Sequence, residues 1–350
     1  MLKLLVLFLF VNLITAQSIN KEPFGTLPTG QNVSIYTLEN NNGVAIKATD
    51  YGATLVSVKV PTGNGQEEIL LGFDNLGDYL NHTAYFGGTI GRFANRIANS
   101  TFTYNNTVYN LSKNDPDPIK GPNSLHGGRR GFDKLLWNVT LSSINTLKFE
   151  LLSPDGDEGY PGNLNVTVLL SLSDDDEIIW TYEATTDKTT PINLSNHGYW
   201  NLAGAGSGRN GIDGQTIQIP ANYYVPVDPK YLIPTGEIKN VTGTPYDLTA
   251  SINIGEAINK TDISFLITMR YLIALTFCLI LSSSFAQLGG GGTGVGLHDN
   301  LGANVGGTGL NANVGANTGG GLLRRRRAPG VLKGAAIGAI AGGAMGAIGR

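Results

Sequence analysis

Short stretches that alternate between apolar and polar residues follow one another along most of the chain. Such alternation, rich in Val, Ile, Thr and Tyr and bounded by Gly, Asn, Asp and Pro, predicts β-strands with one buried face. No stretch keeps a helical period for three turns. Many short strands with turn residues between them indicate an all-β protein, built as a large antiparallel β-sandwich. The predicted strands are residues 33–39, 44–50, 54–60, 147–153, 164–173, 177–186 and 216–227.

Two continuous hydrophobic runs interrupt this pattern. Residues 1–16 carry one positive charge at Lys3, about a dozen apolar residues and a small residue at the end, which is the layout of a secretory signal peptide. Residues 263–286 repeat that layout after Met269, so they predict a second signal-like segment. Alternatively they form a membrane segment, because residues 263–281 approach the roughly 20 residues that cross a bilayer. We expect a secreted, extracellular protein, or one anchored in the membrane through 263–286.

Ten N-x-Ser/Thr sequons agree with a secretory route and predict a glycoprotein. We expect the sequon at Asn193 to stay unmodified, because it lies beside the candidate site described below. The sequons begin at Asn32, Asn81, Asn99, Asn105, Asn110, Asn138, Asn165, Asn193, Asn240 and Asn259.

The last part of the chain, residues 287–350, is a Gly-rich, basic, low-complexity tail. Residues 288–350 contain 21 glycines among 63 residues without a three-residue period, which excludes collagen and predicts a flexible tail. Four adjacent arginines, Arg324 to Arg327, form either solvated charge or a processing site that releases a small cationic peptide. Such a peptide has enough charge to approach anionic membranes.

Charge and cysteine content exclude several classes of protein. The net charge is −3, and residues 17–262 hold 16 Lys and Arg against 26 Asp and Glu, so we expect no nucleic-acid partner. The single cysteine, Cys278, cannot form an intrachain disulfide or a zinc cluster. Neither a phosphate-binding loop nor clustered metal ligands are found, so we expect no cofactor and no metal. We expect a monomer.

Five motifs occur in order between residues 87 and 238. They are GGTIGRFANRI at 87–97, NSLHGG at 123–128, SPDGDEGYPGNL at 153–164, NLSNHGYWNL at 193–202 and VPVDPKYLIPTGEI at 225–238. In this order and spacing the chain resembles the aldose 1-epimerases, and the galactose mutarotase branch most closely, over residues 24–248. The resemblance implies a twisted β-sandwich over residues 17–262 with a sugar site in a cleft over one sheet. It also implies an isomerase that interconverts the α and β anomers of free hexoses such as glucose and galactose.

Anomer exchange needs one acid and one base, and histidine can carry a proton near neutral pH. By resemblance, His197 is the acid that protonates the ring oxygen. The resemblance also implies that Asn95, Arg96 and His126 bind sugar hydroxyls, with Tyr199 close by. An amide both donates and accepts hydrogen bonds, and arginine offers five fixed donors, which suits a polyhydroxylated ligand.

Other residues in the same motifs have structural interpretations. Arg92 is predicted to form a structural ion pair, and Trp137 and Trp200 are predicted to lie in the core. The carboxylates at Asp155, Asp157 and Glu158 are predicted to hold a tight turn, because Asp and Gly in alternation satisfy turn backbone.

The resemblance stops near residue 248. Members of the family carry a sugar-binding aspartate and then a catalytic glutamate farther along, and neither motif is found after Ile254. We therefore expect a truncated sandwich with impaired catalysis. The alternative is an inactive carbohydrate-binding remnant fused to a cationic, antimicrobial-like secreted peptide. Two genes joined in one reading frame, with Met269 as the true start of the second, would explain both features.

Overall fold

A computed structural model describes residues 19–115 and 121–259, together with four short strands farther along the chain. The predicted signal peptide at 1–16 and the predicted hydrophobic segment at 263–286 lie outside the described residues, as does most of the Gly-rich tail. The described residues cover almost all of the segment 17–262, for which the sequence predicts a β-sandwich.

The first sheet comes from the amino-terminal part of the chain. Its five strands are antiparallel and lie in sequence order, so that each strand pairs with the next. They are β1 (Ile19–Thr26), β2 (Asn32–Glu39), β3 (Ala45–Thr49), β4 (Thr54–Thr62) and β5 (Gly65–Glu68). Strand β1 is missed by the alternation pattern, because none of its side chains is fully buried.

The second sheet follows the same meander order. It contains β11 (Asn138–Ser143), β12 (Thr146–Ser153), β13 (Leu164–Leu172) and β14 (Ile178–Thr186), and β20 (Val295–Leu297) pairs with β14. In β13, residues 164, 166, 168, 170 and 172 are buried, and the residues between them are exposed or partly exposed. This period of two is the pattern from which the strand is predicted.

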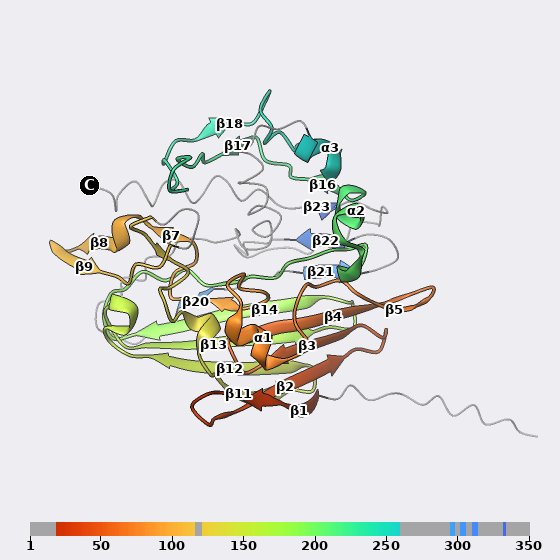
Figure 1. The fold of residues 1–350 in the computed structure, drawn as a ribbon, viewed down its shortest axis with the longest axis horizontal. Coiled ribbons are helices and arrows are strands. Elements are labelled where there is room, and N and C mark those ends of the chain that lie inside the picture. The colour runs from red at the N-terminus through yellow and green to blue at the C-terminus, as the bar shows by residue number, and fades with distance from the viewer. Residues whose placement is uncertain are drawn as a thin grey trace, which may run out of the picture.

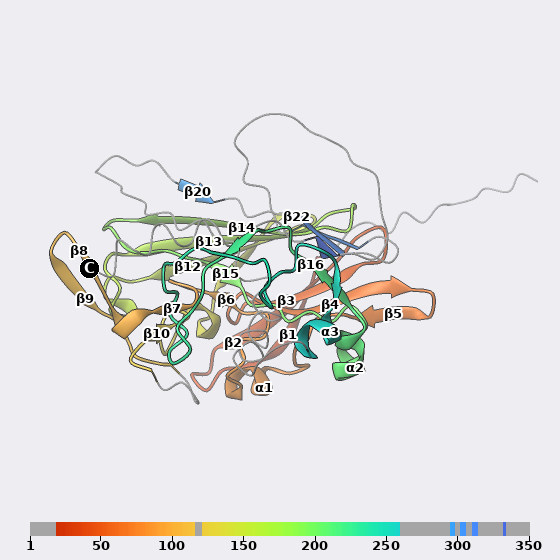
Figure 2. The ribbon, with the colours of Figure 1, turned by 90° about the horizontal axis from the view of Figure 1, so that it is seen from above.

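The two sheets pack face to face as two layers (Figure 2). Ile46 and Val58 of the first sheet share one core with Phe149 and Val168 of the second, and none of the four is more than 1% exposed. Full burial of one such side chain stabilises the fold by roughly 1.5–3 kcal/mol. Trp137 lies in the same core, as predicted. The all-β antiparallel sandwich is therefore confirmed (Figure 1).

Short elements connect and cover the sheets. They are α1 (Leu76–Asn81), β6 (Thr89–Ile90), β7 (Arg96–Ile97), the 3-10 turns Ala98–Ser100, Phe132–Lys134, Asp157–Gly159 and Ala205–Ser207, β8 (Thr101–Tyr104), β9 (Thr107–Asn110), β10 (Ser124–Leu125) and β15 (Ser195–Asn196). Strand β6 pairs with β15, and β7 pairs with β10. These two pairings bring three of the sequence motifs side by side.

Beyond residue 207 the strands become short. The sequence predicts one strand over 216–227, but the structure has β16 (Thr216–Gln218) and β17 (Tyr223–Tyr224) instead. Pro220 interrupts the segment, since proline has no backbone N–H to donate to a ladder. The remaining elements are α2 (Gly208–Asp213), β18 (Lys239–Asn240), β19 (Ile252–Asn253), α3 (Ile254–Asn259), β21 (Gly302–Val305), β22 (Leu310–Asn313) and β23 (Leu332–Lys333).

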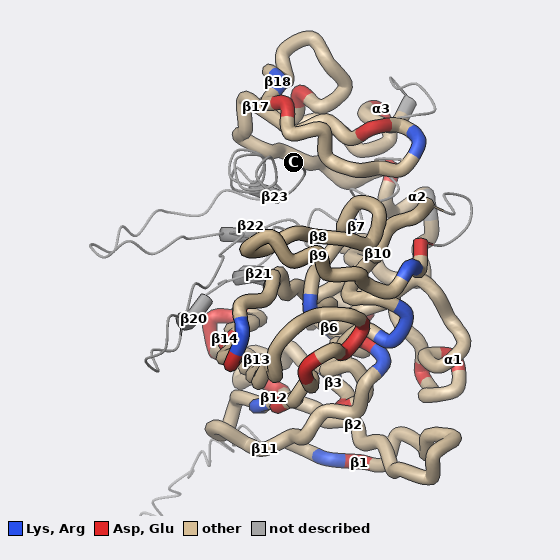
Figure 3. The backbone as a smooth tube through the Cα atoms, turned by 90° about the vertical axis from the view of Figure 1, so that its left-hand side faces the viewer, with Lys and Arg blue, Asp and Glu red and all other residues tan. Residues whose placement is uncertain are grey.

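The helices are short, and the charged residues are of mixed sign. The three α-helices have six residues each, and within the described residues no helix has the length and apolar character needed to cross a bilayer. Acidic and basic residues are interspersed along the described chain (Figure 3). This mixture does not resemble the basic stripe by which proteins hold nucleic acid.

Arg92 ties the segment after β6 to the turn between β12 and β13. Its side chain is buried, with 1% exposure, and it donates to Ser153 Oγ at 2.9 Å and to the carbonyl oxygens of Ser153, Pro154, Pro161 and Gly162 at 2.8 to 2.9 Å. The structural role predicted for Arg92 is correct. Its direct partners are carbonyl groups and hydroxyls, however, so the predicted ion pair is wrong.

Replacing Arg92 should strongly destabilise the fold. We expect Arg92→Met to lower the free energy of unfolding by about 3–5 kcal/mol, because it leaves several buried carbonyl groups without a donor. Urea unfolding measures the change. Arg130→Met, at an exposed arginine, is the control and should change stability by less than about 0.5 kcal/mol. Equal losses in both variants would contradict this account of Arg92.

Candidate active site

Three loops meet beside the sandwich and carry the predicted site residues. The ladder between β6 and β15 places His197 against Gly88, whose carbonyl accepts from the His197 N–H at 2.9 Å. The ladder between β7 and β10 places Arg96 opposite Leu125, next to His126. Asn95 comes from the same turn as Arg96. The two ladders therefore bring residues a hundred positions apart into one site.

A hydrogen bond fixes the orientation of the His126 ring and determines which ring nitrogen carries the proton. The backbone N–H of Asn95 donates to His126 Nδ1 at 3.0 Å, and both residues have positive φ, 66° for Asn95 and 52° for His126. Because Nδ1 accepts, the proton of the neutral ring lies on Nε2. Burial, and then the nearby His197 and Arg96, lower the pKa of His126 well below its usual value. His126 is therefore a neutral hydrogen-bond donor.

His197 lies in a group of stacked rings. Its imidazole is 5.1 Å from the Tyr199 ring centre and 5.7 Å from that of Tyr85, with interplanar angles of 27° and 29°. The ring of His126 meets it edge-on at 5.2 Å. His197 is 5% exposed, and its Nδ1 has no hydrogen-bond partner among the described residues. The side chain is thus ordered mainly by aromatic contact.

Burial changes the proton chemistry expected of His197. The sequence predicts an imidazole that carries a proton near neutral pH, but burial lowers the pKa of His197 to about 4. The imidazolium form is then present in only about one molecule in a thousand at pH 7. The neutral imidazole therefore predominates in the free protein at neutral pH, because desolvation outweighs the hydrogen bonding of the ring.

Arg96 is held by a carboxylate that sequence reasoning missed. Arg96 Nε donates to Asp115 Oδ1 at 2.8 Å, and both side chains are nearly buried. Asn123 donates to the other oxygen, Asp115 Oδ2, at 2.6 Å. Asp115 lies in the polar connection between β9 and β10, outside the motifs, so no sequence pattern indicates it. The ion pair orients the guanidinium beside Asn95 and His126.

Tyr85 is the second residue that the sequence did not indicate. Its ring contacts His197 as described, His126 at 4.7 Å, and the Lys134 ammonium, which lies 4.6 Å from the ring centre. Tyr85 follows α1 in a loop without periodicity, where its backbone φ is 59°. Its position next to GGTIG, at residues 87–91, was the one signal that could have drawn attention to it.

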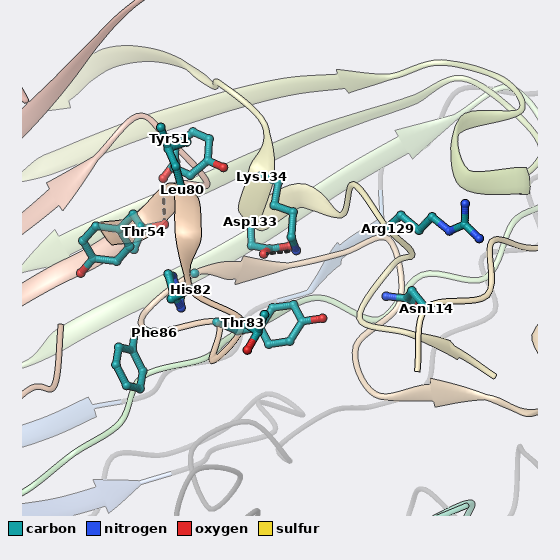
Figure 4. A pocket seen from close by; sticks show the side chains of 13 residues that line it. Tyr51, Thr54, Leu80, His82, Thr83, Phe86, Asn114, Arg129, Asp133 and Lys134 are labelled. Atoms are coloured by element: carbon teal, nitrogen blue, oxygen red, sulfur yellow. Dashed lines mark hydrogen bonds and ion pairs between the residues drawn. The ribbon is translucent and has the colours of Figure 1, made fainter. Parts of the chain in front are cut away.

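A pocket of about 280 Å³ is lined in part by Tyr85, whose ring contacts both imidazoles (Figure 4). Tyr85 and Gly88 belong both to its lining and to the surroundings of His197. The other lining residues are Tyr51, Thr54, Tyr79, Leu80, His82, Thr83, Phe86, Asn114, Arg129, Asp133 and Lys134. None of the five predicted site residues lines this pocket.

The acidic turn has the structural role predicted for it. Asp155 accepts from the Gly162 N–H and from Lys188, and Ser153 donates to Asp157. Glu158 accepts from the backbone N–H groups of Arg129 and Arg130 at 2.9 and 3.0 Å.

Trp200, predicted as a core residue, is partly buried and packs against the main core.

Comparison of the sequence with known proteins identifies the family of this chain. Residues 34–277, more than two thirds of the chain, match the family model described as aldose 1-epimerase. The chain belongs to the aldose 1-epimerase family. It is 42% identical to galactose mutarotase of Bos taurus over 245 residues, covering 69% of this chain and 68% of that protein. It is 41% identical to aldose 1-epimerase of Escherichia coli over 225 residues, covering 64% of this chain and 62% of that protein.

Solved aldose epimerase structures share the fold. Galactose 1-epimerase from Lactobacillus acidophilus NCFM superposes with a TM-score of 0.61 at 30% identity, over 72% of this chain and 71% of that chain. An aldose epimerase homologue from C. elegans gives a TM-score of 0.58 at 30% identity, over 64% and 66%. All five predicted site residues of this aldose 1-epimerase family member lie within the matched range. By family, the chain is an isomerase.

The lowered pKa of His197 makes folding sensitive to acid. Between about pH 6.5 and pH 4 the unfolded chain binds a proton at this histidine that the folded chain does not, so stability falls as the pH falls. We expect His197 to account for about 3 kcal/mol of this loss. Urea unfolding at several pH values measures it, and His197→Asn should flatten the curve. His126 contributes to the pH dependence of both the unchanged protein and His197→Asn. If the free energy of unfolding falls equally with pH in the two, the loss of stability does not come from His197.

Proposed function

We propose that this protein interconverts the α and β anomers of a free hexose by opening and closing the ring. The observation that carries the proposal is the cluster of His197, His126, Asn95 and Arg96, which joins one titratable pair to an amide and a guanidinium. The galactose mutarotase and aldose 1-epimerase relatives support it. Such a site suits a small neutral polyol, whose hydroxyl groups both donate and accept hydrogen bonds.

In this proposal the two imidazoles divide the work. His126, with its proton on Nε2, donates to a sugar oxygen and holds the ring in place. His197 gives its proton to the ring oxygen as the bond between that oxygen and the anomeric carbon breaks, while the anomeric hydroxyl loses its proton to water or to a base in solution. When the ring closes, both protons return. The low pKa makes its imidazolium a strong but scarce acid, and negative charge that develops on the opening sugar raises its proton affinity.

Ring opening also needs a base that takes the proton of the anomeric hydroxyl. Two carboxylates contact the groups around the imidazoles, and both are engaged: Asp115 pairs with Arg96, and Asp133 pairs with Lys134 at 2.6 Å. We therefore propose that the described residues turn over hexose slowly. The same observation favours a second candidate, a carbohydrate-binding remnant without catalysis, joined to a secreted cationic peptide. Continuous transcript reads from residue 262 to residue 269 would argue against such a join.

Polarimetry with α-galactose separates the two candidates. We expect a small protein-dependent rate that His197→Ala abolishes while galactose affinity, measured by calorimetry, changes little. Added acetate should raise the rate of the unchanged protein, because a small carboxylate can stand in for the base, and should not raise that of His197→Ala. Tyr109→Phe, in β9 and outside the set of site residues, is the control. Galactose binding without any His197-dependent rate, with or without acetate, would favour the binding remnant.

We also propose that the protein is secreted and glycosylated. Of the nine sequon asparagines whose side chains are described, eight are exposed. Asn193 is the exception, since it is partly buried and its amide donates to the Ala94 carbonyl at 3.2 Å. Exposed sequons are open to the transferase that attaches glycans.

Peptide mass spectrometry of protein purified from its native source tests this proposal. We expect glycans at exposed sequons such as Asn138 and Asn240, none at Asn193, and an amino terminus at Gln17 after cleavage of residues 1–16. An unmodified chain that still begins at Met1 would contradict the secretory route.

A further inference from the structure

Two polar side chains that line the pocket beside Tyr85 are engaged within the protein. The side chain of Asn114 is fully hydrogen-bonded within the protein. Its oxygen accepts from the Leu125 N–H, and its nitrogen donates to the carbonyls of Leu125 and Gly128. The Tyr79 hydroxyl accepts from the Phe73 N–H at 3.1 Å. These two side chains therefore offer few acceptors to a ligand.

Donors, in contrast, remain available. His82 Nδ1 accepts from the Ala84 N–H at 3.1 Å, so the proton of its neutral ring lies on Nε2. Lys134 uses one N–H for Asp133 Oδ2 and keeps two. Arg129 uses Nε for a backbone carbonyl and keeps its terminal nitrogens. Figure 4 shows Lys134 between His82 on one side and Arg129 on the other.

The charges of the lining point the same way. Lys134 and Arg129 are positive, and Asp133 is the one acidic residue among the lining residues. Asp133 is held by Lys134 through Oδ2, and its Oδ1 is buried without a partner. Glu158 is nearby but does not line the pocket, and it is bound to the backbone N–H groups of Arg129 and Arg130. The lining thus has an excess of one positive charge and of hydrogen-bond donors.

We propose that this pocket binds the anionic group, a carboxylate or phosphate, of a small ligand. Arginine and lysine are the side chains that proteins use most for these groups. A volume of 280 Å³ is at the small end for ligand sites, which suits a single anion or one acidic sugar. Because Tyr85 lines the pocket and stacks on His197, the bound anion lies about one aromatic ring away from the imidazole pair.

Titration calorimetry of the full chain with inorganic phosphate, in the absence of hexose, tests the proposal. We expect saturable binding that Lys134→Met and Arg129→Gln each weaken by roughly tenfold or more. Lys148→Met is a matched control, because Lys148 has the same 2.6 Å ion-pair distance and 36% exposure against 35% for Lys134. Arg129 is exposed, so its variant keeps the test valid if Lys134→Met does not fold.

The source of the anion is settled by a second series with galacturonate and galactose 6-phosphate. Tighter binding of either than of phosphate identifies an acidic sugar as the occupant, and equal binding identifies a free anion. No saturable binding, or binding that the two pocket variants leave unchanged, overturns the proposal. Because mutarotation is not measured in these experiments, the outcome is independent of whether the protein exchanges anomers.

Discussion

The buried guanidinium of Arg92 is the constraint on which the site depends. The segment from Gly87 to Ile97 lies beside the first sheet, where the Leu55 N–H donates to the Gly87 carbonyl, and it stays largely irregular because it presents Asn95 with a positive φ just before Arg96. Irregular backbone exposes carbonyl groups that need donors when they are buried. Arg92 supplies donors to the turn at residues 153–162, which joins β12 to β13, and so fixes the segment 87–97 against one end of the second sheet. One side chain thus serves both the stability of the sandwich and the geometry of the site.

The contacts that order the two imidazoles also bury them, and burial disfavours their charged form. Stacking between Tyr85 and Tyr199 orders His197, and the Asn95 N–H orders His126, but the burial that makes these contacts possible removes water from both rings. Desolvation disfavours the charged form of histidine, so a well-ordered pair is a neutral pair. Acid catalysis at neutral pH then depends on negative charge brought by the substrate or by a carboxylate. The carboxylate partner is therefore more important for this site than it would be for an exposed histidine.

Much of the fold could be predicted from the sequence, because alternation in β13 and in its neighbours records which face is buried. The single strand predicted over 216–227 is divided at Pro220. The apolar pattern continues across the proline, so the pattern alone predicts one strand. Within the site, His197, His126 and Asn95 could be found because they lie in motifs. Asp115 and Tyr85 could not, since their roles come from ladder pairings that bring distant loops together, and no local pattern records such contacts.

Tyr85 separates two environments of different polarity. On one side are two neutral imidazoles with low pKa values, and on the other are Lys134 and Arg129 with unused donors. Electrostatic interactions with the two imidazoles are screened less than they would be in water, because both imidazoles are buried. The positive charge of Lys134 already disfavours the imidazolium form of His126. An anion beside Lys134 would offset that charge and make both imidazoles easier to protonate. Occupancy of the donor-rich pocket and proton affinity at the candidate active site are therefore linked through the electrostatics of one small region.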